Sequence, residues 1–144
     1  MPPKAAMEAR EFIHVSFTTD MITCSFVMDR KVRFVQYGCG KMGKYLMRYG
    51  IEKGGDLVGA FDMNPALHGK DVCEVIGDAY PKTGIKINDS KDAEAILSEL
   101  KPDVCIVATR STVAEIAPIY RICAKLGINA ISTCEEALYP WNSS

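Results

Sequence analysis

A glycine-rich stretch at residues 38–43 carries the clearest chemical signal in this sequence. Its glycines follow the order G-x-G-x-x-G, with Lys41 and Met42 between the last two. Gly38 permits a tight turn, Gly40 lets a diphosphate approach the main chain, and Gly43 lets a helix pack closely on the preceding strand. The first amides of that helix would point at the phosphates. The spacing therefore predicts a loop that contacts a dinucleotide through Gly38, Gly40, Lys41, Met42 and Gly43.

A carboxylate follows at the distance expected after such a loop. Asp62 closes the apolar run 57–61 and stands 19 residues after the last glycine. At the end of a second strand it would accept hydrogen bonds from the adenosine ribose and repel a 2′-phosphate. Residues 63–65 supply no arginine, so NAD is favoured over NADP, although Lys41 and Lys44 soften that preference. The alternative is a glycine-rich turn that binds nothing, and Asp62 makes it the weaker interpretation.

Two further loops follow later strand-like runs and hold polar side chains. Thr109 and Arg110 can contact the nicotinamide ribose, the phosphates or an anionic group, whereas in the alternative Arg110 lies in solvent. Cys134 and Glu135 follow the next run, where a carboxylate can bind a substrate amino group or orient the nicotinamide. For Glu136 we favour the simpler interpretation, an acidic side chain that stabilises the first turn of a helix. These four residues 109, 110, 134 and 135 complete the predicted cofactor site.

No catalytic residue and no metal ligand set is predicted. Cys134 would need a base to act as a nucleophile, and neither His14 nor His68 is placed to provide one. The six cysteines form no CxxC pair and have no histidine at ligand spacing. We expect all six to be reduced, as in a cytoplasmic protein.

Strand and helix patterns alternate from Lys31 onward. This alternation predicts a single α/β domain, a doubly wound parallel sheet of the Rossmann type in three αβα layers. Its expected strand order is 3-2-1-4-5, with the ligand at the carboxyl ends of strands one and four. The expected strands span about residues 32–37, 57–62, 85–88, 103–109 and 129–133, and three of the expected helices span about residues 42–53, 70–76 and 113–126. The other expected helix is capped by Asp89 or Ser90 and has its apolar face between Ala93 and Leu100.

The last predicted helix has the most specific local signals. Thr112 and Glu115 have the spacing of a capping box at its start, and Gly127 ends it. Pro118 falls inside it, which should kink the helix or delay its regular start. The strand before it, 103–109, is a continuous apolar run of the kind buried on both faces of a sheet.

Composition limits the partners that the sequence suggests. With 144 residues, 48% apolar and 24% charged, the chain can form one domain with a sizeable core. Its net charge of −1 gives no basic footprint, so no nucleic-acid partner is expected. No apolar run approaches the roughly 20 residues of a membrane-spanning helix, so no membrane partner is expected.

Residues 1–30 do not follow the alternating pattern. They lack the apolar core of a signal peptide and the Arg-rich, acid-poor bias of a transit peptide. We interpret them as a poorly ordered extension or a mis-assigned start that precedes a dinucleotide-binding domain at 31–144. The competing interpretation is an extra strand within 12–27, which is rich in Thr, Val and Phe.

Several motifs together resemble a known family. Residues Val35–Gly43, Gly69–Val72 and Pro102–Val104 resemble the N-terminal domain of the dihydrodipicolinate reductase family. Within that family, Ile131–Pro140 looks like the 2,4-diaminopentanoate dehydrogenase branch, because true dihydrodipicolinate reductases carry a Gly/Thr-rich loop there. The resemblance covers about residues 31–144.

The resemblance implies the NAD(P)-binding half of an oxidoreductase that oxidatively deaminates a 2,4-diamino acid in ornithine fermentation. It carries over Gly38, Gly40, Gly43 and Asp62 as cofactor contacts, and Thr109 and Cys134–Glu135 as residues beside the nicotinamide. The family's C-terminal substrate domain, which would bind the small amino-acid-derived substrate, has no counterpart in this sequence. The parent enzyme is expected to be a homo-oligomer, since such substrate domains usually build the oligomer.

Two alternatives remain open at this point. One is the N-terminal domain of 4-hydroxy-tetrahydrodipicolinate reductase, an enzyme of lysine biosynthesis, which differs at the loop 133–136. The other is a non-catalytic nucleotide-binding or redox-sensing module, although the sequence has no basic helix-turn-helix segment through which binding could act.

Overall fold

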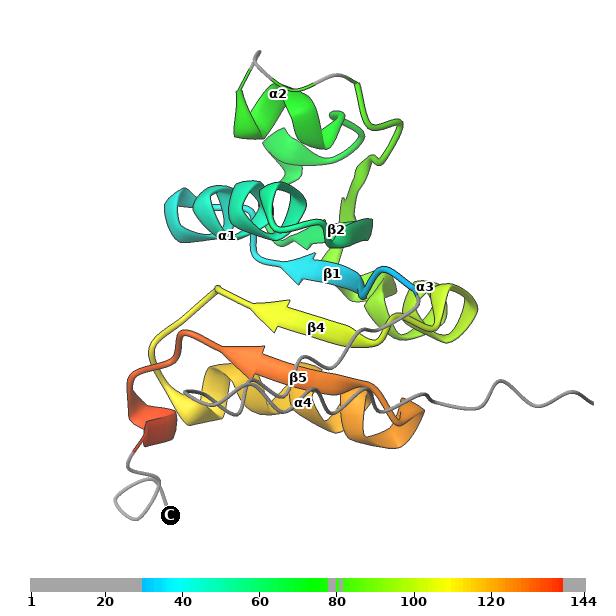
Figure 1. The fold of residues 1–144 in the computed structure, drawn as a ribbon. Helices are drawn as coiled ribbons and strands as arrows, with labels where there is room; N and C mark the ends of the chain where they lie inside the picture. The colour runs from blue at the N-terminus through cyan, green and yellow to red at the C-terminus, as the bar shows by residue number, and fades with distance from the viewer. Residues whose placement is uncertain (1–29, 78–79, 81, 139–144) are drawn as a thin grey trace, which may run out of the picture. The chain divides into compact units, whose positions relative to one another are not determined.

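The structure, a computed structural model, describes residues 30–77, 80 and 82–138 (Figure 1). These residues form a sheet of five parallel strands in the order β3-β2-β1-β4-β5. The predicted doubly wound sheet and its strand order are therefore confirmed. The strands are β1 (Arg33–Tyr37), β2 (Asp56–Asp62), β3 (Ile87–Asp89), β4 (Val104–Val107) and β5 (Asn129–Ser132).

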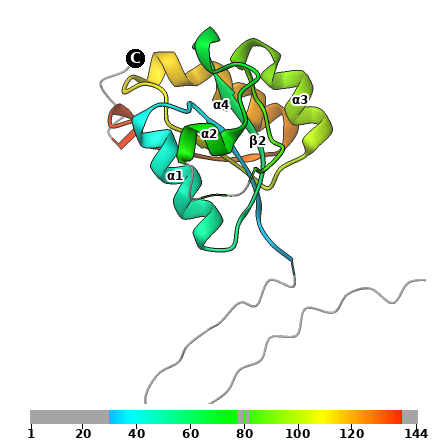
Figure 2. The ribbon, with the colours of Figure 1, turned by 90° about the horizontal axis from the view of Figure 1, so that it is seen from above.

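Helices cover both faces of the sheet, which confirms the three αβα layers. Seen from above, α1 and α2 lie on one side of the strands, and α3 and α4 lie on the other (Figure 2). Three short 3₁₀ turns complete the described elements. The helices are α1 (Lys41–Glu52), α2 (Val72–Ile76), α3 (Ala93–Leu100) and α4 (Val113–Leu126), and the 3₁₀ turns are η1 (Pro65–Leu67), η2 (Ser90–Asp92) and η3 (Glu136–Leu138).

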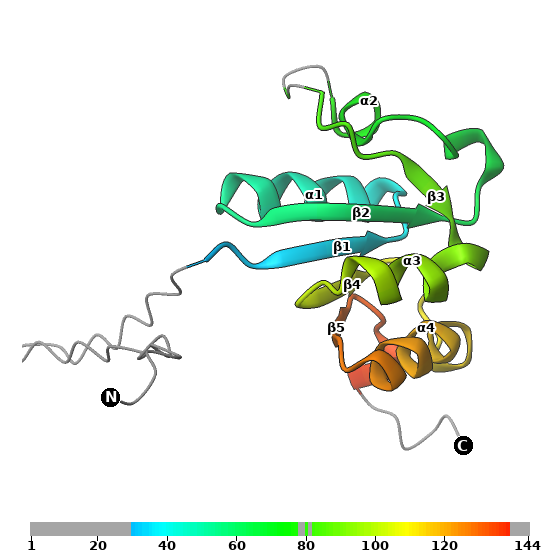
Figure 3. The same cartoon turned by 90° about the vertical axis from the view of Figure 1, so that its right-hand side faces the viewer.

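The strand directions decide where a ligand can meet the main chain. In Figure 3, β1 and β2 point the same way, and α1 begins beside the carboxyl end of β1. Since all five strands are parallel, the loops after β1, β2 and β4 meet at one edge of the sheet. In open α/β sheets, ligands bind in the crevice at this edge, where the strand order reverses.

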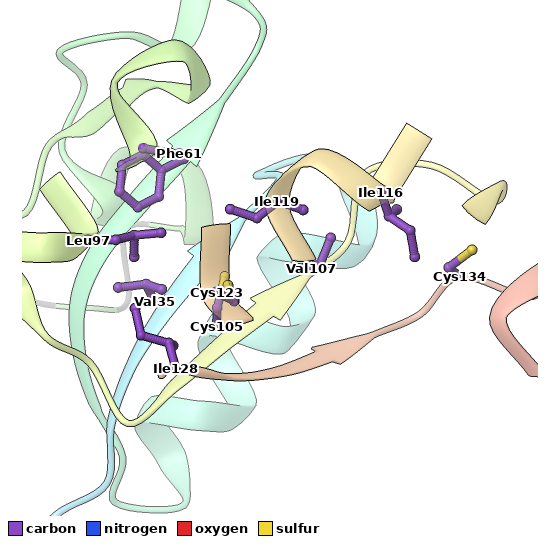
Figure 4. Close-up of a cluster of buried hydrophobic side chains, with 11 residues drawn as sticks. Val35, Phe61, Leu97, Cys105, Val107, Ile116, Ile119, Cys123, Ile128 and Cys134 are labelled. Carbon is purple, nitrogen blue, oxygen red and sulfur yellow. The ribbon is translucent and has the colours of Figure 1, made fainter. Parts of the chain in front are cut away.

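Each face of the sheet has its own apolar core. On the α3–α4 side, strand residues pack against Leu97 of α3 and Ile116 and Ile119 of α4 (Figure 4). On the α1–α2 side, Met47 of α1 and Val72 of α2 pack against the opposite face of the strands. The central strand β1 contributes to both cores and is buried at its three middle positions. This burial on both faces fixes β1, and with it the turn that follows.

The prediction that strand 103–109 is buried on both faces is wrong for β4. Cys105 and Val107 are buried, but Val104 and Ile106 are only half-buried, and Ile131 on the neighbouring β5 is 59% exposed. Val104 and Ile106 belong to the α1 side, where no helix of the described residues packs over β4 and β5. The apolar run therefore has one covered face and one that is partly open.

The start of α4 also differs from the prediction. The Thr112 hydroxyl donates to the Glu115 carboxylate at 2.6 Å instead of accepting a main-chain N–H, so no capping box forms. The helix begins at Val113 and continues through Pro118, so its start is not delayed. Pro118 is an exposed residue in the second turn of α4, where it removes one main-chain N–H donor from the helix without ending it.

Residues 1–29 and 139–144 lie outside the described residues. The interpretation of residues 1–30 as an extension or a mis-assigned start therefore stays a prediction, as does the alternative of an extra strand within 12–27. The same holds for Tyr139 and Pro140, which close the motif that suggests the 2,4-diaminopentanoate dehydrogenase branch.

Candidate dinucleotide-binding site

The turn after β1 requires glycine at position 38. Gly38 has a φ of +96°, and its N–H donates to the carbonyl of Phe61 on β2 at 2.8 Å. A Cβ there would lie 2.4 Å from the carbonyl oxygen of Ala108, which follows β4. The chain at Gly38 is thus held between the ends of both neighbouring strands, and a side chain does not fit.

Close packing at Gly43 brings α1 against this turn. A Cβ at Gly43 would lie 1.9 Å from the Gly38 carbonyl oxygen, which no rearrangement of a flexible side chain could relieve. The same oxygen accepts a hydrogen bond from Nε2 of Gln36 at 2.9 Å. Gln36 is fully buried, and sequence reasoning missed its role; a polar residue in the middle of a buried strand was the available signal.

The loop is open where a ligand would approach. Gly40 is the N-cap residue of α1, and an added Cβ would meet no atom within 4 Å. No side chain caps α1, and its first turn holds no acidic residue. The first-turn residues Lys41 and Met42 are exposed. Main-chain amides at this helix start can therefore donate to an anion, as the electrostatics of a helix N-terminus favour.

Asp62 stands beside this opening at the end of β2. Its Oδ2 accepts the N–H of Cys39, and its Oδ1 accepts the N–H of Asn64, both at 2.7 Å. The carboxylate therefore ties the glycine-rich loop to the segment after β2. Each oxygen keeps a further lone pair for a ligand hydroxyl. His68 lies next to it, with Nε2 2.9 Å from the main-chain oxygen of Asp62.

Cys39, which stands between the first two glycines of the motif, is not suited to act as a nucleophile. Its side chain is fully buried, and its thiol lies 3.5 Å from the Phe61 carbonyl oxygen that it faces. Burial first, and then the negative charge of Asp62, raise the pKa of the Cys39 thiol to about 12. The thiol therefore stays protonated at neutral pH, and Cys39 contributes packing rather than reactivity.

The loop after β4 lies partly against the glycine-rich turn. The Thr109 Cγ2 atom would be 2.8 Å from a Cβ at Gly38, so these two residues are neighbours. Arg110 is exposed and forms an ion pair with Glu115 of α4 at 3.7 Å. The structure thus brings Thr109, but not the Arg110 guanidinium, next to the predicted diphosphate loop.

The segment after β5 is bound to the start of α4. Cys134 is only 3% exposed, and its thiol donates to the carbonyl of Ser111 at 3.0 Å. Cys134 belongs to the same buried apolar cluster as Ile116 of α4 (Figure 4). The Glu136 carboxylate accepts the N–H of Val113, the first residue of α4, at 2.5 Å. Glu136 therefore caps a helix 23 residues earlier in the sequence, a role that its own neighbours do not indicate.

Glu135 differs from its two neighbours because it is exposed to solvent. No group of three or more His, Cys, Asp or Glu side chains in the described part of the chain is arranged to hold a metal ion. No helix within the described ranges is both long enough and apolar enough to cross a membrane.

The strand order, the glycine-rich turn and the carboxylate after β2 define a Rossmann-type α/β domain. An amine dehydrogenase from Mycobacterium smegmatis shares this fold, with a TM-score of 0.73 and 33% identity over 81% of this chain. The chain spans 33% of the length of that enzyme. No family model matches the sequence. No curated protein matches it either.

Two less similar structures share the fold alone. The WlbA (WbpB) dehydrogenase from Thermus thermophilus, solved with NAD and UDP-GlcNAcA, has a TM-score of 0.54 and 22% identity over 70% of this chain and 32% of its own. The repressor RSP, solved with NAD⁺ and operator DNA, has a TM-score of 0.56 and 19% identity over 78% of this chain and 56% of its own.

The RSP complex corrects one expectation. We expected no nucleic-acid partner because the net charge is −1, and that exclusion is wrong: a protein that contains this fold binds operator DNA. The match covers 56% of the repressor chain, so the net charge of this sequence describes only part of such a protein. The charge of the shared domain therefore does not report on DNA binding by a protein that contains it.

Proposed function

We propose that this chain is the nicotinamide-dinucleotide-binding part of an oxidoreductase that acts on an amine derived from an amino acid. The observation that carries the proposal is the opening at Gly40. Empty space there adjoins the uncapped start of α1, and Asp62 is hydrogen-bonded to the same loop through Cys39. An anion above the loop and a ribose hydroxyl at the carboxylate satisfy both groups together.

Each residue of the predicted site has a role in this proposal. The main chain at Gly38, Gly40 and Gly43, with Lys41 and Met42 at the helix start, would hold the diphosphate. Asp62 would accept from the adenosine ribose, and by itself this carboxylate favours NAD over NADP. The nicotinamide end would lie toward the residues that follow β4 and β5, which are Thr109, Arg110, Cys134 and Glu135. The cofactor would supply hydride transfer. Arg110 is paired with Glu115 and the Cys134 thiol with Ser111, so Thr109 and Glu135 are the side chains proposed to contact and orient it.

An amine as substrate is supported by two likenesses. Over 81% of its length, this chain is 33% identical to an amine dehydrogenase. Its motifs also resemble the 2,4-diaminopentanoate dehydrogenase branch of the dihydrodipicolinate reductase family, whose members deaminate a diamino acid. The near alternative is the reductase of lysine biosynthesis. Since the chain spans a third of the amine dehydrogenase, the residues that would bind the substrate are not assigned.

A second candidate function is a non-catalytic nucleotide sensor. It is favoured by the likeness to RSP, a Rex-family repressor that has been solved with NADH and, separately, with NAD⁺ and operator DNA. A sensor would bind the dinucleotide with the same loop and need no substrate. Turnover of a diamino acid distinguishes the two candidates.

Binding of NADH to the purified chain tests the proposal directly. Calorimetric titration should show a one-to-one complex, and Gly40→Leu should weaken it by about a hundredfold because the side chain fills the space left for the diphosphate. The fold should be retained, since a Cβ at Gly40 meets no neighbouring atom. Lys53→Leu, at the exposed far end of α1, is the matched control and should bind as the unaltered chain does.

Activity tests the finer assignment. With the full-length gene product, reduction of NAD⁺ or NADP⁺ by 2,4-diaminopentanoate should be measured beside oxidation of NADH or NADPH by 4-hydroxy-tetrahydrodipicolinate. Turnover of the diamino acid supports the proposal, and turnover of 4-hydroxy-tetrahydrodipicolinate favours the reductase. Tight NADH binding with neither activity favours the sensor.

A further inference from the structure

Gln36 is a polar residue at one of the three buried positions of β1, and it is fully buried. Side chains alternate between the two faces of a strand, and Phe34, two residues earlier, belongs to the core on the α1–α2 side. The Gln36 side chain extends into the same core, where its Nε2 would lie 3.3 Å from a Cβ at Gly43 of α1. An apolar residue of similar size would fill this position without a buried amide, so the amide needs a physical explanation.

The amide of Gln36 is hydrogen-bonded to the main chain of the glycine-rich turn. Nε2 donates to the carbonyl of Gly38 at 2.9 Å, and the nitrogen must be the atom on that side because a carbonyl oxygen can only accept. Within the described residues, no group donates to Oε1 of Gln36. Burial of that oxygen opposes folding, whereas one hydrogen bond gives a modest net gain. The two contributions largely offset each other, so stability does not account for a glutamine at this position.

The peptide group between Gly38 and Cys39 is held at both ends. Its carbonyl oxygen accepts from Gln36, and its N–H donates to Oδ2 of Asp62 at 2.7 Å. Because a peptide group is planar, these two contacts together fix its orientation. The side chains that hold it come from two neighbouring strands, β1 and β2.

The orientation of this peptide group matters because the main chain here can rotate. Gly38 has a φ of +96°, and glycine reaches many main-chain conformations since it has no Cβ. Its carbonyl points to α1, where a Cβ at Gly43 would lie 1.9 Å from the oxygen. A rotation would turn the carbonyl away from Gly43 and the Cys39 N–H away from Asp62. Because carbonyl oxygens repel an anion and N–H groups attract it, the rotated loop would bind a diphosphate less tightly.

We propose that Gln36 is a positioning residue for dinucleotide binding. It acts through the peptide group between Gly38 and Cys39, which it holds in the orientation that joins the loop to Asp62. The proposal rests on the proposed function, because it takes the glycine-rich loop and Asp62 as the binding groups. It adds a prediction that the proposed function does not make: a fully buried side chain with little net effect on stability controls the affinity for the dinucleotide.

Gln36→Met tests this role, because methionine has a similar length and volume but cannot donate to the Gly38 carbonyl. Calorimetric titration should show the affinity for NADH reduced by about tenfold. Urea unfolding should place the midpoint of the variant at or above that of the unaltered chain, because the variant buries no polar amide. A purely structural role would give the opposite result, a lower midpoint with unchanged affinity, and would overturn the proposal.

Phe34→Leu is the matched control on the same strand and the same face. Phe34 is buried and packs against Gly50 and Gly55, away from the start of α1. Loss of part of its ring leaves a cavity, so the unfolding midpoint should fall, while NADH affinity should change by less than about twofold. The two variants should therefore have opposite profiles of stability and affinity.

The amide proton of Cys39 gives a measurement that does not depend on NADH. In the unaltered chain this N–H donates to a carboxylate oxygen at 2.7 Å, so its nuclear magnetic resonance signal should lie downfield. In Gln36→Met the signal should move upfield, because the peptide group can turn away from Asp62, and in Phe34→Leu it should stay in place. A Cys39 signal that is the same in Gln36→Met and in the unaltered chain would overturn the proposal.

A measurement on the unaltered chain covers the case in which Gln36→Met does not fold. Saturation with NADH should shift the side-chain amide signals of Gln36 together with the Cys39 signal, because both report on one peptide group beside the ligand. If the Cys39 signal moves and the Gln36 signals do not, Gln36 is not coupled to the loop and the proposal is overturned.

The outcomes separate this proposal from the proposed function. If the unaltered chain binds NADH and Gln36→Met binds it equally well, only the positioning role is overturned. If the folded, unaltered chain does not bind NADH, the proposed function is overturned and the positioning role with it.

Discussion

The loops at the carboxyl edge of the sheet differ sharply between the two halves of the domain. Around α1, Gly40 faces empty space, the helix start has no capping side chain, and three cationic side chains of α1 line a cavity of about 430 Å³. Around α4, the corresponding groups already have partners: Glu136 caps the helix start and the Cys134 thiol donates to Ser111. The two helices begin in equivalent places, but only α4 has a side chain that accepts a main-chain N–H at its start.

The difference suggests a division of roles. Under the proposed function, the first half would hold an anionic ligand by its main chain, at the open and uncapped start of α1. The second half is arranged to hold its own two loops together through contacts between Ser111–Val113 and Cys134–Glu136. The next four experiments test this comparison.

The largest effect on stability is expected at Gly43, where α1 packs directly on the main chain of the turn after β1. Gly43→Ala would place a Cβ 1.9 Å from the Gly38 carbonyl oxygen and should lower the free energy of unfolding by about 3 kcal/mol or more. Gly40→Ala, three residues earlier, should cost less than about 1 kcal/mol because its Cβ meets no atom within 4 Å. Urea unfolding followed by circular dichroism measures both. Equal costs for the two alanines would contradict the described packing of α1 on the turn.

A smaller loss is expected in the second half. Glu136→Ala removes the acceptor for the Val113 N–H at the start of α4 and should cost about 1 kcal/mol, as the loss of a helix cap does. Glu135→Ala is the matched control, since Glu135 is exposed, and should stay within about 0.5 kcal/mol. Indistinguishable unfolding midpoints for the two variants would mean that the segment after β5 is not bound to α4 in solution.

Acid should lower the stability of the first half by protonating Asp71, the N-cap residue of α2. The pKa of Asp71 lies well below its usual range, chiefly because its carboxylate accepts the N–H of Cys73. Smaller contributions come from the hydroxyl of Thr83 and the N–H of Gly84, which donate to the same carboxylate. Because the folded pKa is the lower one, the stabilisation is complete above the unfolded pKa of about 4 and is lost as the pH falls below it.

Thermal unfolding of Asp71→Asn and the unaltered chain, measured between neutral pH and pH 3, tests this expectation. The two curves of stability against pH should converge on acidification, since the variant lacks the titrating group. Parallel curves would show that the bonds to Cys73 and Gly84 contribute no pH dependence.

The smallest effect is expected at Arg110. Its ion pair with Glu115 joins two exposed side chains, so Arg110→Ala should change the free energy of unfolding by less than about 0.5 kcal/mol. NADH affinity should change by less than about twofold if Arg110 points to Glu115 rather than to the ligand. A tenfold loss of NADH affinity would show instead that Arg110 leaves Glu115 to bind the cofactor, as one interpretation of the sequence allowed.

Local patterns in the sequence predicted most of the fold. The apolar runs and amphipathic stretches located the five strands and four helices of the described residues, because burial of a strand or one helix face requires residues of the right type at the right period. The errors were at β4, whose α1-side face is only partly covered, and at Thr112, whose hydroxyl binds Glu115 instead of the main chain. Both depend on neighbours that the local pattern does not contain.

The sequence by itself determined where the strands, the helices and the glycine-rich turn lie, since glycine spacing and apolar period act over a few residues. Only the tertiary structure decided which groups near that loop are open and which are already bound. The contacts of Asp62 with Cys39 and of Glu136 with Val113 join residues from different elements. The cavity likewise combines the cations of α1 with Leu67 and Ile76. Such contacts depend on how the elements pack, and packing is a property of the whole chain.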